Sequence, residues 1–183
     1  MVALVGVLLL GILDGIILAV VGSLLMLLQR TSTPHVAFLG RIPGTNRYTD
    51  IARHPDNERL PGLLIFRVEA ALLYFNVEHV LRTVLKQVQM EQAGLRMVIC
   101  DLSNAAYVDV AGARMLSRLY EELKPLHIGL RIVGAHASER DILRAERLDE
   151  VAGPIHRDIS VADACAELAA VTTNTGRGLE RKP

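Results

Sequence analysis

The sequence of 183 residues contains no tryptophan, and its aromatic content is only 4%. Its 20 basic residues are balanced by 20 acidic residues, so the formal net charge is zero. Proteins that bind nucleic acid usually carry a basic surface, and those that bind single strands also need aromatic side chains for base stacking. The composition therefore argues against a nucleic-acid partner.

Cysteine is also scarce, with only Cys100 and Cys165 present. Two cysteines cannot form the dense disulfide framework of a small secreted domain. Both lie in apolar sequence contexts, so we expect buried thiols in a reducing compartment. The chain is 51% hydrophobic and only 22% charged, a balance that excludes a disordered protein.

The sequence lacks the local motifs of common catalytic and metal sites. None of G-x-S-x-G, G-x-x-x-x-G-K-[ST], H-E-x-x-H and C-x-x-C occurs, and the six histidines are scattered without metal-ligand spacing. We therefore expect no cofactor, no metal and no enzymatic activity. Arg140, Arg144 and Arg147 either clamp a phosphate or form solvated ion pairs along a helix, and their acidic neighbours favour the ion pairs.

A long apolar run begins the sequence. Val2–Leu28 contains one charged residue, Asp14, and as a helix it would be about 40 Å long, against a hydrocarbon core of about 30 Å. A secretory signal peptide would need basic residues before the apolar core, and none precedes Arg30. We therefore predict a transmembrane segment over residues 1–29. Basic residues follow it and place the rest of the chain in the cytoplasm, namely Arg30, Arg41 and Arg47.

Asp14 and Gly15 divide this run into arms of about 12 and 14 residues, each shorter than the roughly 20 that a span needs. The segment is either one kinked helix or two half-length arms that meet at a break. Asp14 is costly in lipid and marks either an ion site or, as we favour, a helix cap or interfacial turn. Small residues recur every four positions and form a stripe for packing against another helix, namely Gly11, Gly15, Ala19 and Ser23.

The rest of the chain divides into a linker (30–61), an α/β segment (62–171) and a tail (172–183) that we expect to be disordered. The linker contains an expected short strand, Val36–Leu39, and an expected loop over 44–59. Apolar runs alternate with helical periodicity over 62–171, which predicts an α/β domain with a mostly parallel sheet and about four helices. The expected strands are 63–68, 97–100, 128–133 and 155–159, and the expected helices are 77–88, 116–123 (ended by Pro125), 138–150 (capped by Ser138 and Asp141) and one capped by Ser160 and Asp163.

Polar residues stand where the central strand ends and the next helix begins. Asp101 and Ser103 follow the strand, and the helix opens with Asp109 and Gly112. Ligand sites of α/β proteins usually lie at this edge of the sheet. Catalysis would need a base for Ser103, and no histidine is placed by sequence to serve. We therefore favour Asp109 as a helix N-cap, with Asp101 and Ser103 holding the loop.

These residues resemble a known family. Asp101-Leu102-Ser103, followed by Val108-Asp109, Gly112 and Met115-Leu116, is similar to the STAS domain shared by sulfate transporters and bacterial anti-sigma-factor antagonists. The C-terminus of SulP-family anion permeases has similar upstream segments, which correspond here to Pro34–Thr45, Tyr48, Ile65–Arg67 and Leu73–Glu78. The resemblance reaches to about Val171.

The resemblance implies a STAS-like fold and a cytoplasmic regulatory and interaction module, not an enzyme. In SulP permeases this module follows two short paired membrane helices, which favours two half-length arms here. The motif loop is then a structural or partner-binding site, formed by Asp101, Ser103, Asp109 and Gly112. Anti-sigma-factor antagonists are phosphorylated on a serine directly after the motif aspartate. Here Val110 and Ala111 follow it, so that switch is absent.

We therefore expect a C-terminal piece of a SulP-type transporter for a sulfate-like anion, located in the cell membrane. It should not transport alone, because the substrate site of these permeases lies in earlier helices. Its expected partners are the membrane, the remaining transporter helices or further copies of itself, and a cytoplasmic protein that binds the STAS domain. The alternative is a membrane-anchored, stand-alone STAS regulatory protein that binds a protein partner or a nucleotide.

Overall fold

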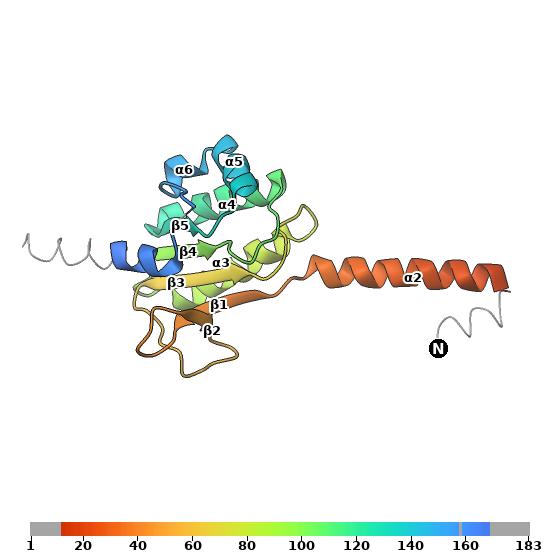
Figure 1. The fold of residues 1–183 in the computed structure, drawn as a ribbon, viewed down its shortest axis with the longest axis horizontal. Helices are drawn as coiled ribbons and strands as arrows, with labels where there is room; N and C mark the ends of the chain where they lie inside the picture. The colour runs from red at the N-terminus through yellow and green to blue at the C-terminus, as the bar shows by residue number, and fades with distance from the viewer. Residues whose placement is uncertain (1–11, 158, 169–183) are drawn as a thin grey trace, which may run out of the picture. The chain divides into compact units, whose positions relative to one another are not determined.

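The computed structural model describes residues 12–157 and 159–168 (Figure 1). The chain divides between Pro34 and His35 into two compact units. The first unit contains helix α2 (Ile12–Ser32), whose 21 residues correspond to about 32 Å. The large apolar side chains along α2 are exposed, and the stretch Ile12–Gln29 is long and apolar enough to cross a membrane by length and composition.

Helix α2 is longer than the second arm expected from the sequence, because it starts before Asp14 and continues to Ser32. Asp14 lies in its first turn, where a carboxylate interacts favourably with the helix dipole. Gly15, Ala19 and Ser23 follow one another at four-residue intervals along the helix. Gly11 and nearly all of the predicted first arm lie outside the described residues.

The second unit is built on a five-stranded sheet with the order β2-β1-β3-β4-β5. Strands β3, β4 and β5 are parallel, whereas β1 is antiparallel to both of its neighbours. The predicted α/β class is confirmed. The sheet is mixed, because the short β1–β2 connection allows only antiparallel pairing. The strands are β1 (Val36–Arg41), β2 (Tyr48–Asp50), β3 (Leu63–Val68), β4 (Met97–Asp101) and β5 (Gly129–Val133).

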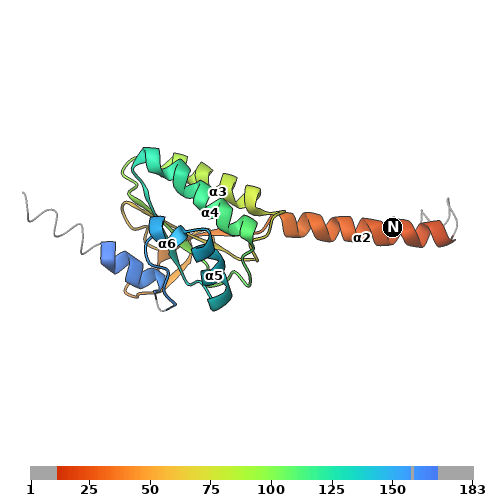
Figure 2. The same ribbon diagram turned by 90° about the horizontal axis from the view of Figure 1, so that it is seen from above.

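Helices α3 (Val77–Glu91) and α4 (Val110–Leu123) lie side by side on one face of the sheet (Figure 2). Both match helices predicted from apolar spacing, and α4 ends in a 3-10 turn that contains Pro125. Helices α5 (Ala137–Ala145) and α6 (Leu148–Val151) follow β5. The larger core lies on this face and includes the fully buried side chains Phe66, Leu72, Leu81, Leu116, Leu119, Ile132 and Leu143.

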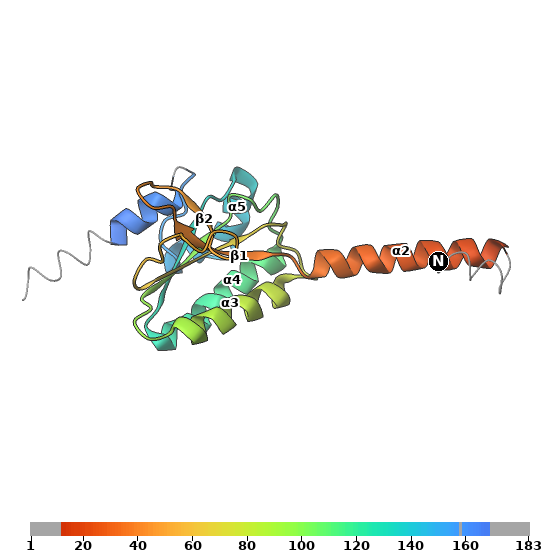
Figure 3. The same ribbon diagram turned by 90° about the horizontal axis from the view of Figure 1, so that it is seen from below.

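The opposite face of the sheet carries a smaller core under a helical stretch at 161–168 (Figure 3). Ser160 and Asp163 cap this stretch as predicted, since Ser160 N donates to Asp163 Oδ2 (2.9 Å) and Asp163 N donates to Ser160 Oγ (3.3 Å). Both cysteines are buried and free, as predicted. Burial raises the pKa of the Cys100 thiol well above its ordinary value.

The predicted loop over residues 44–59 contains strand β2, which the sequence analysis missed. The strand is held by side chains from outside it. Asn57 Nδ2 donates to the carbonyl oxygen of Thr49 (3.1 Å) and to Thr49 Oγ1 (2.7 Å). Asp50 is buried, which opposes its ionisation, but His35 and the Ala52 N–H stabilise the carboxylate and leave its pKa below the ordinary value.

Three further local predictions are wrong. Helix α5 is capped by His136 and Glu139 rather than by Ser138 and Asp141, and His136 N donates to Glu139 Oε2 at 2.8 Å. The expected single helix to residue 150 is interrupted at Arg147, whose φ of 58° is left-handed. No strand occurs among the described residues of 155–159, because Ile155 is buried in the larger core instead of pairing along the sheet.

Candidate functional site at the carboxyl end of the sheet

Asp101 and Arg67 are register partners at the carboxyl ends of β4 and β3. Asp101 is only 2% exposed, and its Oδ2 accepts hydrogen bonds from Arg67 Nε (2.9 Å) and Nη2 (2.7 Å). Its Oδ1 accepts from Ser103 N at 2.9 Å. Both oxygens of Asp101 therefore bind groups of the chain itself, and the residue ties β3 to the loop after β4.

Gly134 lies directly against this arrangement. A Cβ at this position would stand 2.8 Å from Asp101 Oδ1 and 2.9 Å from Ser103 N, and the backbone φ of +72° is left-handed. Both conditions require glycine. The end of β5 can therefore approach the end of β4 closely, and the Asp101 carboxylate is enclosed on that side.

An open cavity of about 530 Å³ lies over this edge. It is lined by the β1–β2 turn, the ends of β3, β4 and β5 and the start of the 161–168 stretch, and its polar side chains include Arg47, Tyr48, Arg67, Asp101, Arg157 and Ser160. Burial and a hydrogen bond with Cys165 raise the pKa of Tyr48 to about 12, so this phenol stays protonated at neutral pH. No histidine is among the described residues of the lining, so the exposed Ser103 hydroxyl has no imidazole base there.

Asp109 does not line this cavity. Its Oδ1 accepts from Gly112 N at 2.8 Å, which is the N-cap bond of α4, and its Oδ2 accepts from Tyr74 N at 3.0 Å. The surrounding loop pairs with the segment before α3, since Leu72 N donates to the Tyr107 carbonyl (2.9 Å). The motif is thus divided between two places, with Asp101 and Ser103 at the cavity and Asp109 at the start of α4.

Gly112 lets the first turn of α4 approach this segment. A Cβ there would lie 2.9 Å from Val108 Cγ1 and 3.0 Å from the carbonyl oxygen of Leu72. The backbone oxygen cannot move without shifting the paired loop, so a larger side chain would force the helix and the loop apart. Gly112 therefore serves close packing rather than ligand contact.

Apolar side chains are exposed around Asp109. Tyr74 is 75% exposed, and Tyr107 and Val110 are each 47% exposed. The Tyr74 ring meets the Phe75 ring edge-on, with centroids 5.3 Å apart. We call Tyr74, Tyr107 and Val110 the Asp109 patch. Only the family resemblance indicated the segment before α3, because helical and strand periodicity do not report which loop side chains face solvent.

Replacing Asp109 with alanine is expected to lower the free energy of unfolding by about 1–2 kcal/mol. The substitution removes the acceptor for Gly112 N at the helix start and for Tyr74 N in the neighbouring loop. Thermal melts of the full chain in detergent measure the change. Asp141→Ala is the control, because that side chain is 81% exposed and should alter stability by less than about 0.5 kcal/mol. Equal melting temperatures for the two variants would contradict the capping role.

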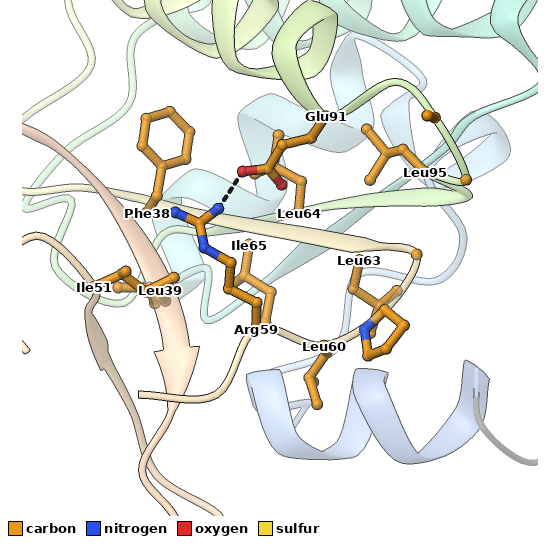
Figure 4. A pocket seen from close by; sticks show the side chains of 14 residues that line it. Phe38, Leu39, Ile51, Arg59, Leu60, Leu63, Leu64, Ile65, Glu91 and Leu95 are labelled. Atoms are coloured by element: carbon orange, nitrogen blue, oxygen red, sulfur yellow. Dashed lines mark hydrogen bonds and ion pairs between the residues drawn. The ribbon is translucent and has the colours of Figure 1, made fainter. Parts of the chain in front are cut away.

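A second cavity, of about 420 Å³, lies toward the amino ends of β3 and β4 (Figure 4). Its lining is mainly apolar and includes Phe38, Leu60 and Leu95. The charged groups at its edge are Arg59 and Glu91, which form an ion pair with each other. Gln87 Nε2 also donates to Glu91 Oε1 at 2.5 Å. The charged side chains at the edge of this cavity thus pair with one another.

The three arginines considered as a phosphate clamp have separate partners. Arg140 Nη1 donates to the Ala135 carbonyl (2.9 Å), and Arg144 Nη2 donates to the Ile155 carbonyl (3.1 Å). Arg147 Nε donates to Glu150 Oε1 at 2.9 Å. The expected surface ion pairing therefore holds for Arg147 and for Arg144, whose Nη1 lies 3.9 Å from Asp141 Oδ1. Arg140 and Arg144 also hold backbone segments together. Within the described part of the chain, no group of three His, Cys, Asp or Glu side chains could hold a metal ion.

Comparisons with a family model and with known proteins agree on one family. Residues 54–162 match the model of the STAS domain. The chain is 28% identical to high affinity sulfate transporter 2 of Stylosanthes hamata over 83% of its own length and 24% of the transporter. It is 31% identical to a probable sulfate transporter of Mycobacterium tuberculosis over 80% of its length and 26% of that protein. The chain thus spans about a quarter of these relatives, which are named as transporters and not as enzymes.

The fold agrees with that of a solved anion transporter. The structure of murine solute carrier 26 family member A9 in its inward-facing state aligns with 92% of this chain and 28% of the transporter. The TM-score is 0.76 at 18% sequence identity, a level that shows the shared fold. The aligned share is larger than the part matched by the STAS model alone.

Proposed function

This chain belongs to the STAS domain family, homologous to the C-terminal region of sulfate transporters, and on that premise we propose that it is the cytoplasmic regulatory module of a SulP-type inorganic anion transporter. The observation that carries the proposal is the combination of an exposed apolar helix with a STAS unit in one chain. Relatives named as sulfate transporters match across most of the chain, which supports the same conclusion.

The chain works, on this proposal, as the C-terminal part of a larger assembly. Helix α2 anchors it in the cell membrane and packs its small residues against a partner helix, either of the remaining transporter or of a second copy. An exposed helix of this hydrophobicity needs lipid or another apolar surface around it. The STAS unit then lies in the cytoplasm, as the basic residues after the apolar run favour.

The Asp109 patch is the proposed contact surface for a cytoplasmic protein partner. Asp109 holds the loop and the helix start in place, so Tyr74, Tyr107 and Val110 are presented from a backbone that is fixed by hydrogen bonds. Tyrosine is enriched at protein interfaces because it buries a large ring while its hydroxyl can remain hydrogen-bonded. We do not expect phosphorylation at the helix start to release this partner, since Val110 and Ala111 carry no hydroxyl.

Protease accessibility in membrane vesicles tests this arrangement. Trypsin is expected to cleave the STAS unit in inverted vesicles at exposed basic residues such as Arg53, and to leave it intact in sealed spheroplasts. Detergent-permeabilised spheroplasts are the control, because they should show the cleavage seen in inverted vesicles. Recovery of the chain in the soluble fraction, or cleavage in intact spheroplasts, would refute the membrane-anchored cytoplasmic module.

The stand-alone regulatory protein remains the alternative to a transporter module. Both interpretations give the same protease result, and they differ in what α2 contacts. Crosslinking in the native membrane distinguishes them. Adducts with separate transporter helices support the transporter module, and their absence supports the stand-alone protein. Adducts between copies of this chain agree with both.

A further inference from the structure

We propose that the open cavity at the carboxyl end of the sheet binds a tetrahedral oxyanion, either free sulfate or phosphate or the phosphate group of a small metabolite. The binding itself does not depend on the proposed transporter function. Only the idea that the bound anion acts as a cytoplasmic signal to a transporter rests on that function. The argument starts from the charges that line the cavity.

Three guanidinium groups line this cavity and come from three separate parts of the fold. Arg47 lies in the β1–β2 turn, Arg67 in β3 and Arg157 before the 161–168 stretch, and Asp101 is the carboxylate among the lining residues. Positive charge therefore exceeds negative charge among the described lining side chains. A concave surface with this excess concentrates anions, and arginine suits oxyanions because its planar donors match their oxygen geometry.

Arg67 is already held in position for such a contact. Its Nε and Nη2 donate to Asp101 Oδ2, and its Nη1 makes no hydrogen bond with another described residue. Its side chain is 21% exposed. The ion pair therefore fixes the guanidinium plane while Nη1 keeps two N–H donors available, so little conformational entropy is lost when an anion binds.

The nearby acidic and hydroxyl groups indicate where the anion would lie. Hydrogen bonds from Ser160 lower the pKa of Asp163, so this carboxylate is ionised near the Ser160 side of the cavity and disfavours an anion there. The protonated Tyr48 hydroxyl, which forms a hydrogen bond with Cys165, adds no negative charge to the lining. We therefore place the anion between Arg47 and Arg67.

The cavity is large enough for either source of the oxyanion. A volume of about 530 Å³ falls within the usual range of small-molecule sites and exceeds what a bare sulfate ion needs. The cavity can therefore also admit an organic group attached to a phosphate. Sulfate, inorganic phosphate and glycerol 3-phosphate serve as separate probes for these sources.

Isothermal titration calorimetry of the full chain in non-ionic detergent tests the proposal, with sodium chloride holding the ionic strength constant. Saturable binding of at least one probe is expected with a Kd of about 1 mM or lower. Arg47→Gln should weaken it about tenfold or more, because a charged hydrogen-bond donor is lost. Arg96→Gln is the matched control, since it removes the same charge beside the amino end of β4 and should leave the Kd unchanged.

The double variant Arg67→Gln with Asp101→Asn removes the buried charge pair together, so that neither charge is left unpaired. It should remain folded by circular dichroism and lose saturable binding. Binding of sulfate alone would identify a free inorganic anion, and binding of glycerol 3-phosphate alone would identify a metabolite phosphate. The proposal is overturned if no probe binds saturably, if Arg47→Gln and Arg96→Gln have equal effects, or if the folded double variant binds like the parent chain.

Discussion

Proteoliposomes that contain only this chain are expected to take up no sulfate above the level of empty vesicles. Alternating access requires two helical bundles that move around a binding site near the bilayer midplane. The described residues contain one helix long and apolar enough to span a bilayer. One such helix cannot enclose a path for a hydrated dianion. We therefore expect no sulfate uptake, in contrast to a complete transporter.

The control for this assay is a complete sulfate transporter reconstituted in the same lipids and at the same protein-to-lipid ratio. The orientation and recovery of this chain should be checked by protease digestion, so that absent uptake is not due to absent protein. Saturable sulfate uptake by the chain alone would contradict the proposed role as a module. It would require a pore formed by several copies of the chain.

A related variant tests the packing face of α2. Gly15→Leu should reduce association in the membrane, because leucine at the stripe keeps two helix backbones apart. Val20→Leu is a suitable control, since Val20 is exposed and lies about 140° around the helix from Gly15, away from the stripe. Equal crosslinking yields for the two variants would mean that the stripe does not mediate association.

Asp101→Ala is expected to destabilise the STAS unit by about 3–5 kcal/mol, the largest stability effect of any single substitution considered. The change leaves the largely buried Arg67 guanidinium without its counter-ion, which is costly in a low-dielectric site. It also removes the acceptor for Ser103 N. Since domains of this size are stable by only about 5–15 kcal/mol, the melting temperature should fall by about 10 °C or more.

Two comparisons make this result interpretable. Glu78→Ala breaks the exposed ion pair with Arg118 and should cost less than about 1 kcal/mol, because water screens that pair. Replacing both Arg67 and Asp101 with leucine should restore much of the lost stability, since no buried charge then stays unpaired. Circular dichroism melts of the full chain in detergent measure all three. Similar losses for Asp101→Ala and Glu78→Ala would contradict a structural role for the buried pair.

The sequence by itself determined the elements whose signals are local. Apolar spacing located α3, α4 and the strands β1, β3, β4 and β5, because burial of one face imposes a period on neighbouring residues. The cap formed by Ser160 and Asp163 could likewise be predicted from the sequence, since both partners lie within one helical turn. The apolar run through α2 needed only length and composition.

Only the tertiary structure decided which distant residues meet. Strand β2 forms by pairing with β1, and Asn57 and His35 bind its polar residues, which carry no strand period of their own. Arg67 joins Asp101 because β3 and β4 pair in register, 34 residues apart along the chain. Sequence patterns report periodic burial along one segment, whereas strand pairing and the cavity it forms depend on contacts between segments, which leave no local period.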